Sequence, residues 1–332
     1  MKYYVICDYR ENFKNYSLSP LNLYSDHPTR KNITEIIEAL HELGYDCEFF
    51  GGIPELIHAV DQNYTFESCV FLNFTDGMEQ DYSRVQAPVL LDILDVPYSG
   101  SNVMATVLMN NKYFCKQALL DHEIPMPQGR IINSIMKLNM EDLYSWKYPL
   151  FIKPNCEGSS LGISQNNVCC SEIELKERIK ELSSEFEEII VEEYVGNLDV
   201  TNYLIGNEGN YLINDIVVAA LPGTLKFPVY GISEKQNKLQ TLSFNDEFLP
   251  SEIVRQIKDC SERIAKILGA KDICRIDYRY DKTTKKFYFI EANSAPRFSS
   301  TSEIGYIAKK RGLQFKDMIQ KYVTAFTSHI HN

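Results

Sequence analysis

Residues 273–300 read ICRIDYRYDKTTKKFYFIEANSAPRFSS and begin as two runs of alternating apolar side chains around a polar turn at 281–286. Alternation with period two on both sides of a polar turn is typical of an antiparallel β-hairpin. The midpoint of the turn falls near residue 284, so pairing about it puts Asp277 opposite Glu291. The same pairing predicts one face that carries four polar side chains: Arg275, Asp277, Glu291 and Asn293.

Two carboxylates that face each other across a hairpin repel one another. A hard divalent cation removes this repulsion, and the oxygens of Asp277, Glu291 and Asn293 are the ligands that Mg²⁺ prefers. The alternative is an exposed hairpin whose carboxylates point into solvent. Asn293 and Arg275 on the same face favour the metal site.

A second candidate is the stretch 148–164, YPLFIKPNCEGSSLGIS, in which Lys153 ends an apolar run and a glycine- and serine-rich loop follows. Glycines let backbone N–H groups approach a phosphate, and a lysine neutralises it. The stretch is neither a P-loop nor a dinucleotide fingerprint, because the lysine precedes the glycines. An ordinary glycine turn remains the alternative.

The third candidate, 190–200, reads IVEEYVGNLDV and places Glu192 at a strand end, with Asp199 seven residues later. A strand that stops at a cleft can offer backbone groups to an adenine and a carboxylate to a ribose. The alternative is an acidic surface turn.

The first hundred residues alternate between strand and helix signals, which predicts a parallel, doubly wound sheet. The strands are expected at 3–7, 46–50 and 68–74, and the helices at 34–43 and 85–94. No GxGxxG follows the first strand, which argues against a Rossmann dehydrogenase. The fold class is therefore α/β, with three units that share one cleft.

Charge and cysteine content limit the function classes. Lys and Arg number 34 and Asp and Glu number 45, which gives a net charge of −11 and argues against nucleic acid or membrane as a partner. Nine cysteines without a CxxC pair are expected to be reduced thiols of a cytoplasmic protein. The N-terminus is expected to be a first strand rather than a signal peptide, and no apolar run approaches the length of a membrane span.

The order of these motifs resembles the ATP-grasp fold, and within it the D-alanine–D-alanine ligase family, over most of residues 85–325. The resemblance implies an α/β N-terminal domain at 1–108, a central ATP-grasp subdomain at 109–195 and a C-terminal subdomain at 196–332. It implies that ATP is held by these residues: Lys112 and Lys153 at the phosphates, the closing loop of Glu157, Gly158, Ser159 and Ser160, Glu192 and Val195 at the adenine, and Asp199 at the ribose.

The resemblance also implies two Mg²⁺ ions, with Mn²⁺ as an alternative, on Asp277, Glu291 and Asn293. Arg275 and Ser159 would act in catalysis, and Ser302 would hold the carboxylate of the amine substrate. The expected activity joins a carboxylate to an amine through an acyl phosphate and releases ADP and phosphate. Closure of the loop and of the segment 223–239 would keep water out. A homodimer is expected by resemblance alone.

The N-terminal third departs from the family, which carries a GGxSxE-type start and an HGxxGEDG-type segment. The corresponding stretches here read YYVICDYREN and NFTDGMEQDYS. Arg297 replaces the usual glycine after proline, and Glu303 replaces an apolar residue. These differences favour another amino acid, a dipeptide or a carrier-bound acid over D-alanine as both substrates. A ligase that loads a carrier protein and a non-catalytic ATP-binding module stay as alternatives.

Overall fold

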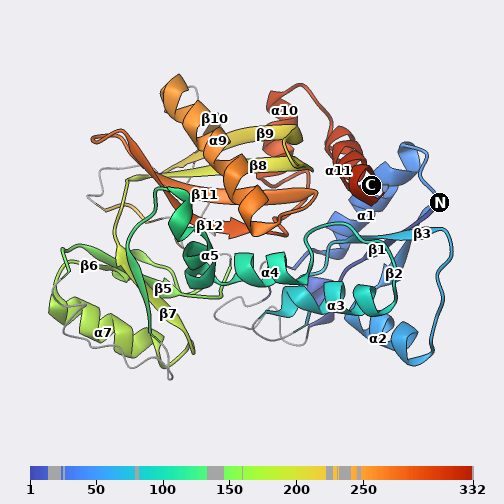
Figure 1. The fold of residues 1–332 in the computed structure, drawn as a ribbon, viewed down its shortest axis with the longest axis horizontal. Helices are drawn as coiled ribbons and strands as arrows, with labels where there is room; N and C mark the ends of the chain where they lie inside the picture. The colour runs from blue at the N-terminus through green and yellow to red at the C-terminus, as the bar shows by residue number, and fades with distance from the viewer. Residues whose placement is uncertain are drawn as a thin grey trace.

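The computed structural model describes residues 1–13, 24, 27–78, 82–132, 146–158, 160–221, 227–229, 231, 241–244 and 248–330. Ser159 and most of the segment 223–239 lie outside these residues. Three sheets and their helices form the molecule, with the N-terminal sheet at one end and a small α/β unit at the other (Figure 1). No described helix is long and apolar enough to cross a membrane.

The N-terminal sheet is parallel and three-stranded, in the order β2-β1-β3. Its elements are β1 (Lys2–Ile6), α1 (Arg30–Glu42), β2 (Cys47–Gly51), α2 (Ile53–Asp61), β3 (Cys69–Asn73) and α3 (Gln86–Ile93). Alternate residues of β1 enter two cores: Val5 packs with α1 on one face, and Ile6 packs with α2 and α3 on the other. Helices on both faces of a parallel sheet confirm the predicted doubly wound arrangement.

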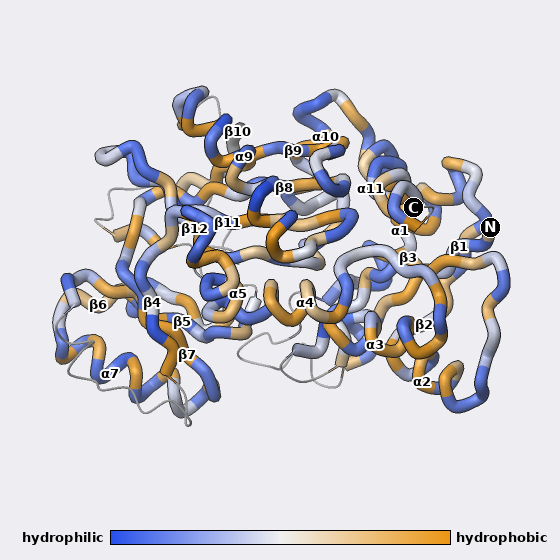
Figure 2. The backbone as a smooth tube through the Cα atoms, in the orientation of Figure 1, coloured by the Kyte–Doolittle hydropathy of each residue, from blue (hydrophilic) through white to orange (hydrophobic). Residues whose placement is uncertain are grey.

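The second sheet is antiparallel and four-stranded, in the order β4-β7-β5-β6. Its elements are β4 (Gly129–Ile132), β5 (Leu150–Pro154), β6 (Val168–Cys169), α7 (Glu172–Leu182) and β7 (Ile189–Glu193). Leu175 and Leu182 of α7 pack on β5 and β7 and close a small separate core. Strand β7 begins hydrophobic and ends hydrophilic (Figure 2), so its last residues are polar where it meets the rest of the molecule.

The third sheet is antiparallel and five-stranded, in the order β10-β9-β8-β11-β12. It contains β8 (Leu198–Asn207), β9 (Asn210–Ala220), β10 (Thr241–Phe244), β11 (Ile273–Asp281) and β12 (Lys286–Asn293). Its helices are α4 (Val103–Asn110), α5 (Lys112–Leu119), α9 (Ser251–Leu268), α10 (Glu303–Lys310) and α11 (Phe315–Ile330). Short 3₁₀ turns occur at Arg10–Asn12, Ser83–Val85, Leu120–His122 and Gln165–Asn167.

Helices α4 and α5 pack against α9 and this third sheet in one core. The predicted limit between the first two domains, at residues 108 and 109, therefore falls inside α4, a helix that shares a core with the C-terminal sheet. The domain limits remain a prediction.

A β-bulge sets the register of the β11–β12 hairpin. Tyr278 pairs with Phe289 and Asp277 pairs with Glu291, so Ile290 has no residue opposite it. Strict alternation would put Glu291 on the same buried face as Phe289. Because the bulge inserts one residue, it turns Glu291 to the face of Asp277. The predicted facing of the two carboxylates is confirmed, but alternation alone does not produce it.

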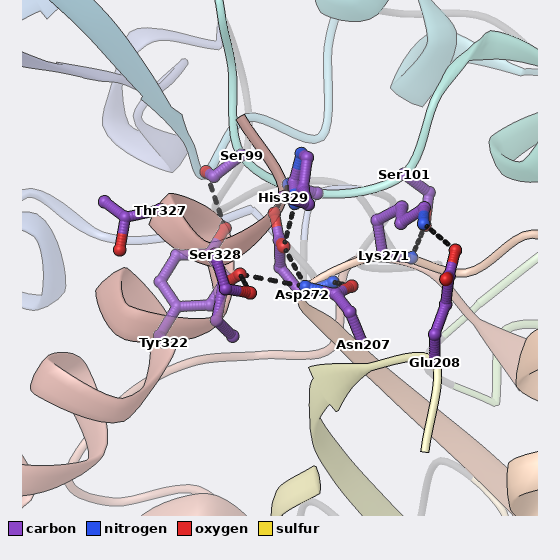
Figure 3. A network of polar contacts seen from close by, with 12 residues as sticks. Ser99, Ser101, Asn207, Glu208, Lys271, Asp272, Tyr322, Thr327, Ser328 and His329 are labelled. Atoms are coloured by element: carbon purple, nitrogen blue, oxygen red, sulfur yellow. Dashed lines mark hydrogen bonds and ion pairs between the residues drawn. The ribbon is translucent and has the colours of Figure 1, made fainter. Parts of the chain in front are cut away.

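The N-terminal sheet and the third sheet are joined through Asp272, which is fully buried at the start of β11. Its carboxylate accepts hydrogen bonds from the backbone N–H of Gly100 at 2.7 Å and the amide of Asn207 at 3.0 Å, and it pairs with His329 Nδ1 at 2.8 Å. Nearby, Tyr322 of α11 contacts Ser99 at 2.7 Å. Figure 3 shows this network, which ties the loop before α4 and the last helix to β8 and β11.

The N-terminal strands and helix α3 have bounds within one residue of the expected ones. Helix α1 begins at Arg30, four residues before the expected start, because Thr29 caps it by accepting the N–H of Asn32. Strand β5 ends at Pro154, one residue after Lys153, the last residue of the apolar run. Helices α2 and α4 were not predicted.

Candidate active site

A cleft between the second and third sheets gathers most of the predicted site residues. Its walls include Lys112, Lys153, Glu157, Gly158, Ser160, Glu192, Val195, Asp199, Arg275, Asp277 and Glu291. These residues come from α5, β5, β7, β8, β11, β12 and the loop after β5. Motifs that lie up to 179 residues apart in the sequence, from Lys112 to Glu291, therefore meet in one place.

On the side of β5 and β7, the bottom of the cleft is formed by three buried, charged side chains. Glu192 is 2 % exposed and pairs with Lys153 at 2.9 Å and, more closely, with Lys116. Burial would raise the pKa of Glu192, but the two lysines outweigh it and lower that pKa. Burial lowers the pKa of Lys116 to about 8 even though Glu192 opposes the shift. Both oxygens of the Glu192 carboxylate are thus paired with lysines, and its predicted role at the adenine stays a prediction.

Lys112, the first residue of α5, bridges this floor to the hairpin. Its ammonium lies 3.2 Å from a Glu291 carboxylate oxygen and donates to the backbone carbonyl of Glu157 at 2.5 Å. Glu157 begins the glycine loop, so one lysine holds the loop beside the hairpin carboxylate. Burial opposes ionisation of Glu291, yet Lys112, Lys153 and Arg275 lower its pKa to about 2.

Three rows of side chains cross β8, β11 and β12 on the cleft face. The middle row is Thr201, Asp277 and Glu291, and the row nearer α10 is Tyr203, Arg275 and Asn293. Thr201 donates its hydroxyl hydrogen to Asp277 at 2.8 Å, and the Arg275 guanidinium contacts the other Asp277 oxygen at 2.9 Å. Burial raises the pKa of Asp277, and the neighbouring Glu291 adds to this, while Arg275 opposes it.

The third predicted metal ligand, Asn293, is bound from the N-terminal domain. Arg84 donates to the Asn293 amide oxygen at 2.9 Å and pairs with Asp76 at 2.6 Å. Each predicted ligand therefore has a cationic neighbour: Arg275 at Asp277, Lys112 at Glu291 and Arg84 at Asn293. Two facing carboxylates and an amide oxygen within reach of one another fit a hard cation such as Mg²⁺.

The outer row of the hairpin face holds Asp199. Arg279 lies opposite it across β8 and β11 and donates to both carboxylate oxygens, at 2.9 and 3.1 Å. The same guanidinium reaches the Tyr194 hydroxyl at 2.8 Å and the Val195 carbonyl at 3.3 Å. This arginine joins the two segments that the sequence assigned to adenine and ribose.

Ser302 and Arg297 lie away from these charges. The Ser302 hydroxyl contacts the carbonyls of Ser299 at 2.9 Å and Arg297 at 3.1 Å, within its own turn. Arg297 is exposed at the edge of a second cavity, between the N-terminal domain and the segment 294–298. Asp76 and Arg84 line that cavity as well. The role of Ser302 in substrate binding stays a prediction, and Ser159 lies outside the described residues.

Sequence reasoning missed four side chains of the site. Lys116 lies one helical turn after Lys112, a spacing that could have revealed it. Arg279 follows Asp277 by two residues and Thr201 follows Asp199 by two, so strand alternation places each of them on the cleft face. Arg84 gave no such signal, because its contact with Asn293 spans 209 residues.

Comparisons with known proteins agree with this geometry. A family model described as D-ala D-ala ligase C-terminus matches residues 126–324. The D-alanine–D-alanine ligase of Aquifex aeolicus is 32 % identical over 295 residues, which cover 87 % of this chain and 92 % of that protein. The ligase of Carboxydothermus hydrogenoformans is 27 % identical over 241 residues, 70 % of this chain and 73 % of the relative.

Two solved structures share the fold over nearly the whole chain. A D-alanine–D-alanine ligase from Bacillus anthracis, complexed with ATP, superposes with a TM-score of 0.75 at 18 % identity and covers 99 % of this chain and 98 % of that one. The VanG D-Ala:D-Ser ligase of Enterococcus faecalis has a TM-score of 0.70 at 18 % identity, with 98 % and 99 % covered.

Proposed function

This chain belongs to the D-alanine–D-alanine ligase family of ATP-dependent ligases, and on that premise we propose that it joins an amino acid or short peptide to an amine through an acyl phosphate. ATP is the phosphoryl donor, and ADP and phosphate are released. The family's cytoplasmic setting is proposed for this chain as well.

The observation that supports this most strongly is the set of cations around one cleft. Lys112, Lys153 and Arg275 each lie beside a carboxylate within reach of the same cavity. A triphosphate that enters this cleft finds lysines already positioned, so little reorganisation is needed as charge moves between its oxygens. An ordinary surface acidic turn or glycine turn would not carry buried lysines at these distances.

Asp277, Glu291 and Asn293 would hold Mg²⁺ at the end of the cleft. When bound, the metal neutralises phosphate oxygens and keeps the transferring group in line. Lys112 and Arg84 now contact two of these ligands, so binding requires them to shift toward the phosphates or the substrate.

Residues of the chain then stabilise the charges that develop during phosphoryl transfer and during attack by the amine. Lys112 and Lys153 offset the charge on the phosphates while the donor carboxylate attacks the γ-phosphate. Arg275 faces the acyl group and stabilises the oxyanion that forms when the amine attacks. Glu157, Gly158 and Ser160 line the cleft, and closure of the glycine loop would protect the acyl phosphate from water.

The nucleoside is expected between β7 and β8. The backbone of the Glu192–Val195 segment would meet the adenine edge, and Asp199, oriented by Arg279, would accept the ribose hydroxyls. The carboxyl donor is expected in the second cavity beside Arg84 and Asp76, because that cavity adjoins Asn293 at the end of the cleft.

Trapping with hydroxylamine tests the proposal. A neutral nucleophile captures an acyl phosphate as a hydroxamate, so we expect ATP- and Mg²⁺-dependent hydroxamate formation with at least one amino acid or dipeptide donor. Glu291→Gln should abolish it while retaining ATP binding, whereas Glu172→Gln, an exposed acid on α7, should behave as wild type. Absence of hydroxamate and of ADP release with all amino acids, dipeptides and carrier proteins would contradict the proposal.

A further inference from the structure

Glu303 places a carboxylate at a position where the D-alanine–D-alanine ligase family has an apolar residue. It is the first residue of α10 and lines the cleft together with Arg275 and Asp277. Its position follows Ser302, which the sequence assigned to the carboxylate of the amine substrate. An acid at this place changes what the acceptor end of the cleft attracts.

A buried tyrosine holds this carboxylate in the cleft. The Tyr203 hydroxyl donates to Glu303 Oε2 at 3.2 Å from β8, and the Tyr203 side chain is fully buried. Burial, with the charge of Glu303, raises the pKa of Tyr203 well above its ordinary value, so the hydroxyl keeps its proton and remains a donor. Among the described residues, the other Glu303 oxygen accepts no hydrogen bond.

The neighbouring hydroxyl, that of Ser302, makes its contacts within its own turn. Ser302 Oγ donates toward the carbonyls of Ser299 and Arg297 and accepts the Ser299 N–H at 3.3 Å. Its hydrogen is therefore used inside the turn that precedes α10. A substrate carboxylate placed here would have to displace these contacts to gain the Ser302 hydrogen bond, and it would meet the Glu303 carboxylate.

An acid in the first turn of a helix also has an ordinary explanation, because it stabilises the helix dipole. Glu252 in the first turn of α9 is the matched case, and it is exposed and pairs with Arg255 of its own helix at 2.7 Å. Glu303 instead turns to a buried residue of another element and faces a cavity. This difference indicates a ligand-binding role.

We propose that Glu303 selects the acceptor by pairing with a second ammonium group, so that the preferred amine substrate is a diamine or a diamino acid. The inference rests on the proposed ligase function and adds the chemical class of its acceptor. One amine of the acceptor attacks the acyl phosphate, and the other, still protonated, pairs with the open Glu303 oxygen. A neutral side chain of the same length would leave that carboxylate desolvated and unpaired.

The test compares ornithine with norleucine, which has a methyl group in place of the side-chain ammonium. Both enantiomers are offered as acceptors with the donor that gives hydroxamate, and ADP release and the coupled product are measured. In the wild type, ornithine should exceed norleucine in kcat/KM by roughly ten- to hundredfold. Glu303→Gln should remove this preference, and Tyr203→Phe should reduce it by about threefold or more.

Glu252→Gln is the control, because it removes a helix-start acid outside the cleft and should keep the wild-type preference. Thermal unfolding of every variant shows whether each one folds. Equal use of ornithine and norleucine by the wild type, or an equal loss with both acceptors in Glu303→Gln, would overturn the inference. Absence of hydroxamate with any donor in the wild type overturns the proposed function itself, whereas hydroxamate without an ornithine preference overturns only the acceptor class.

Discussion

The cleft and the junction at Asp272 both bury charge, but they assemble it differently. In the cleft, Asp199 and Arg279 face each other in register across adjacent strands, and Arg275 and Asp277 lie two residues apart on β11. At the junction, Asp272 precedes β11, Asn207 ends β8 and His329 lies in α11. Strand alternation and register therefore account for these two pairs of the cleft, whereas no local pattern brings the residues of the junction together.

We therefore expect the cleft to carry the chemistry and the junction to hold the domains together. Cleft charges pair with charges, so each can be exchanged for a phosphate or a metal ion when ligands bind. The Asp272 carboxylate instead accepts two hydrogen bonds from neutral N–H groups and one contact from a histidine. We therefore expect substitutions in the cleft to alter turnover and substitutions at the junction to alter stability.

The largest expected effect is on turnover, in Asp277→Asn. Loss of this charge leaves Arg275 without its anionic partner and replaces a charged predicted metal ligand with a neutral one, so we expect kcat to fall roughly hundred- to thousandfold. ADP release gives kcat, and titration with ATP gives the affinity. Asp281→Asn, in the turn of the same hairpin, should keep near wild-type turnover. An equal loss in both variants would show that only hairpin stability matters.

The next largest effect is a loss of stability, although the substituted residue lies in the cleft. Glu192→Ala leaves Lys116 and Lys153 buried without their anion, and breaking a buried pair in this way costs about 3–5 kcal/mol. The shift in the midpoint of urea unfolding measures it. Glu193→Ala, at the next residue of β7, is the matched control and should shift the midpoint far less. A small shift in Glu192→Ala would mean that the lysines are solvated.

At the junction, Asp272→Ala should destabilise the protein by about 2–3 kcal/mol, because it leaves the Gly100 N–H and the Asn207 amide without their acceptor. Urea unfolding is again the measurement, and ATP affinity should be unchanged. Glu208→Ala removes the exposed partner of Lys271 in the same network (Figure 3) and should leave the midpoint where it is. A loss of ATP binding in Asp272→Ala would contradict the expectation that the junction affects stability alone.

The smallest expected effect is a pH dependence in the cleft. The pKa of Glu291 is lowered to about 2 in the folded chain from an ordinary 4.5, so below 4.5 the unfolded chain binds more protons. Its contribution, about 1–3 kcal/mol, is therefore complete above pH 4.5 and is lost as the pH falls toward 2. Unfolding midpoints at pH 6 and pH 3 should differ less in Glu291→Gln than in the wild type. A similar difference in both would contradict the assignment.

The hairpin and the strand that carries Lys153 could be predicted from the sequence, because each depends on spacing within about 20 residues. The contacts of Glu192 were harder to predict, since nothing near it in the sequence shows that Lys116 and Lys153 pair with its carboxylate. The contacts of Arg84 and Asp272 could not be predicted for the same reason. Their partners lie far along the chain, and no local periodicity encodes such a contact.

The bulge at Ile290 affects how this hairpin tolerates changes of length. The turn at 282–285 lies outside the cleft, so insertions in pairs there would lengthen the hairpin and leave the cleft unchanged. A single residue added or removed between Phe289 and Glu291 would reverse the phase of the strand and turn the Glu291 carboxylate into the hydrophobic core. Substitutions along β12 change one side chain at a time, whereas deletion of Ile290 would remove the Glu291 carboxylate from the cleft without substituting Glu291.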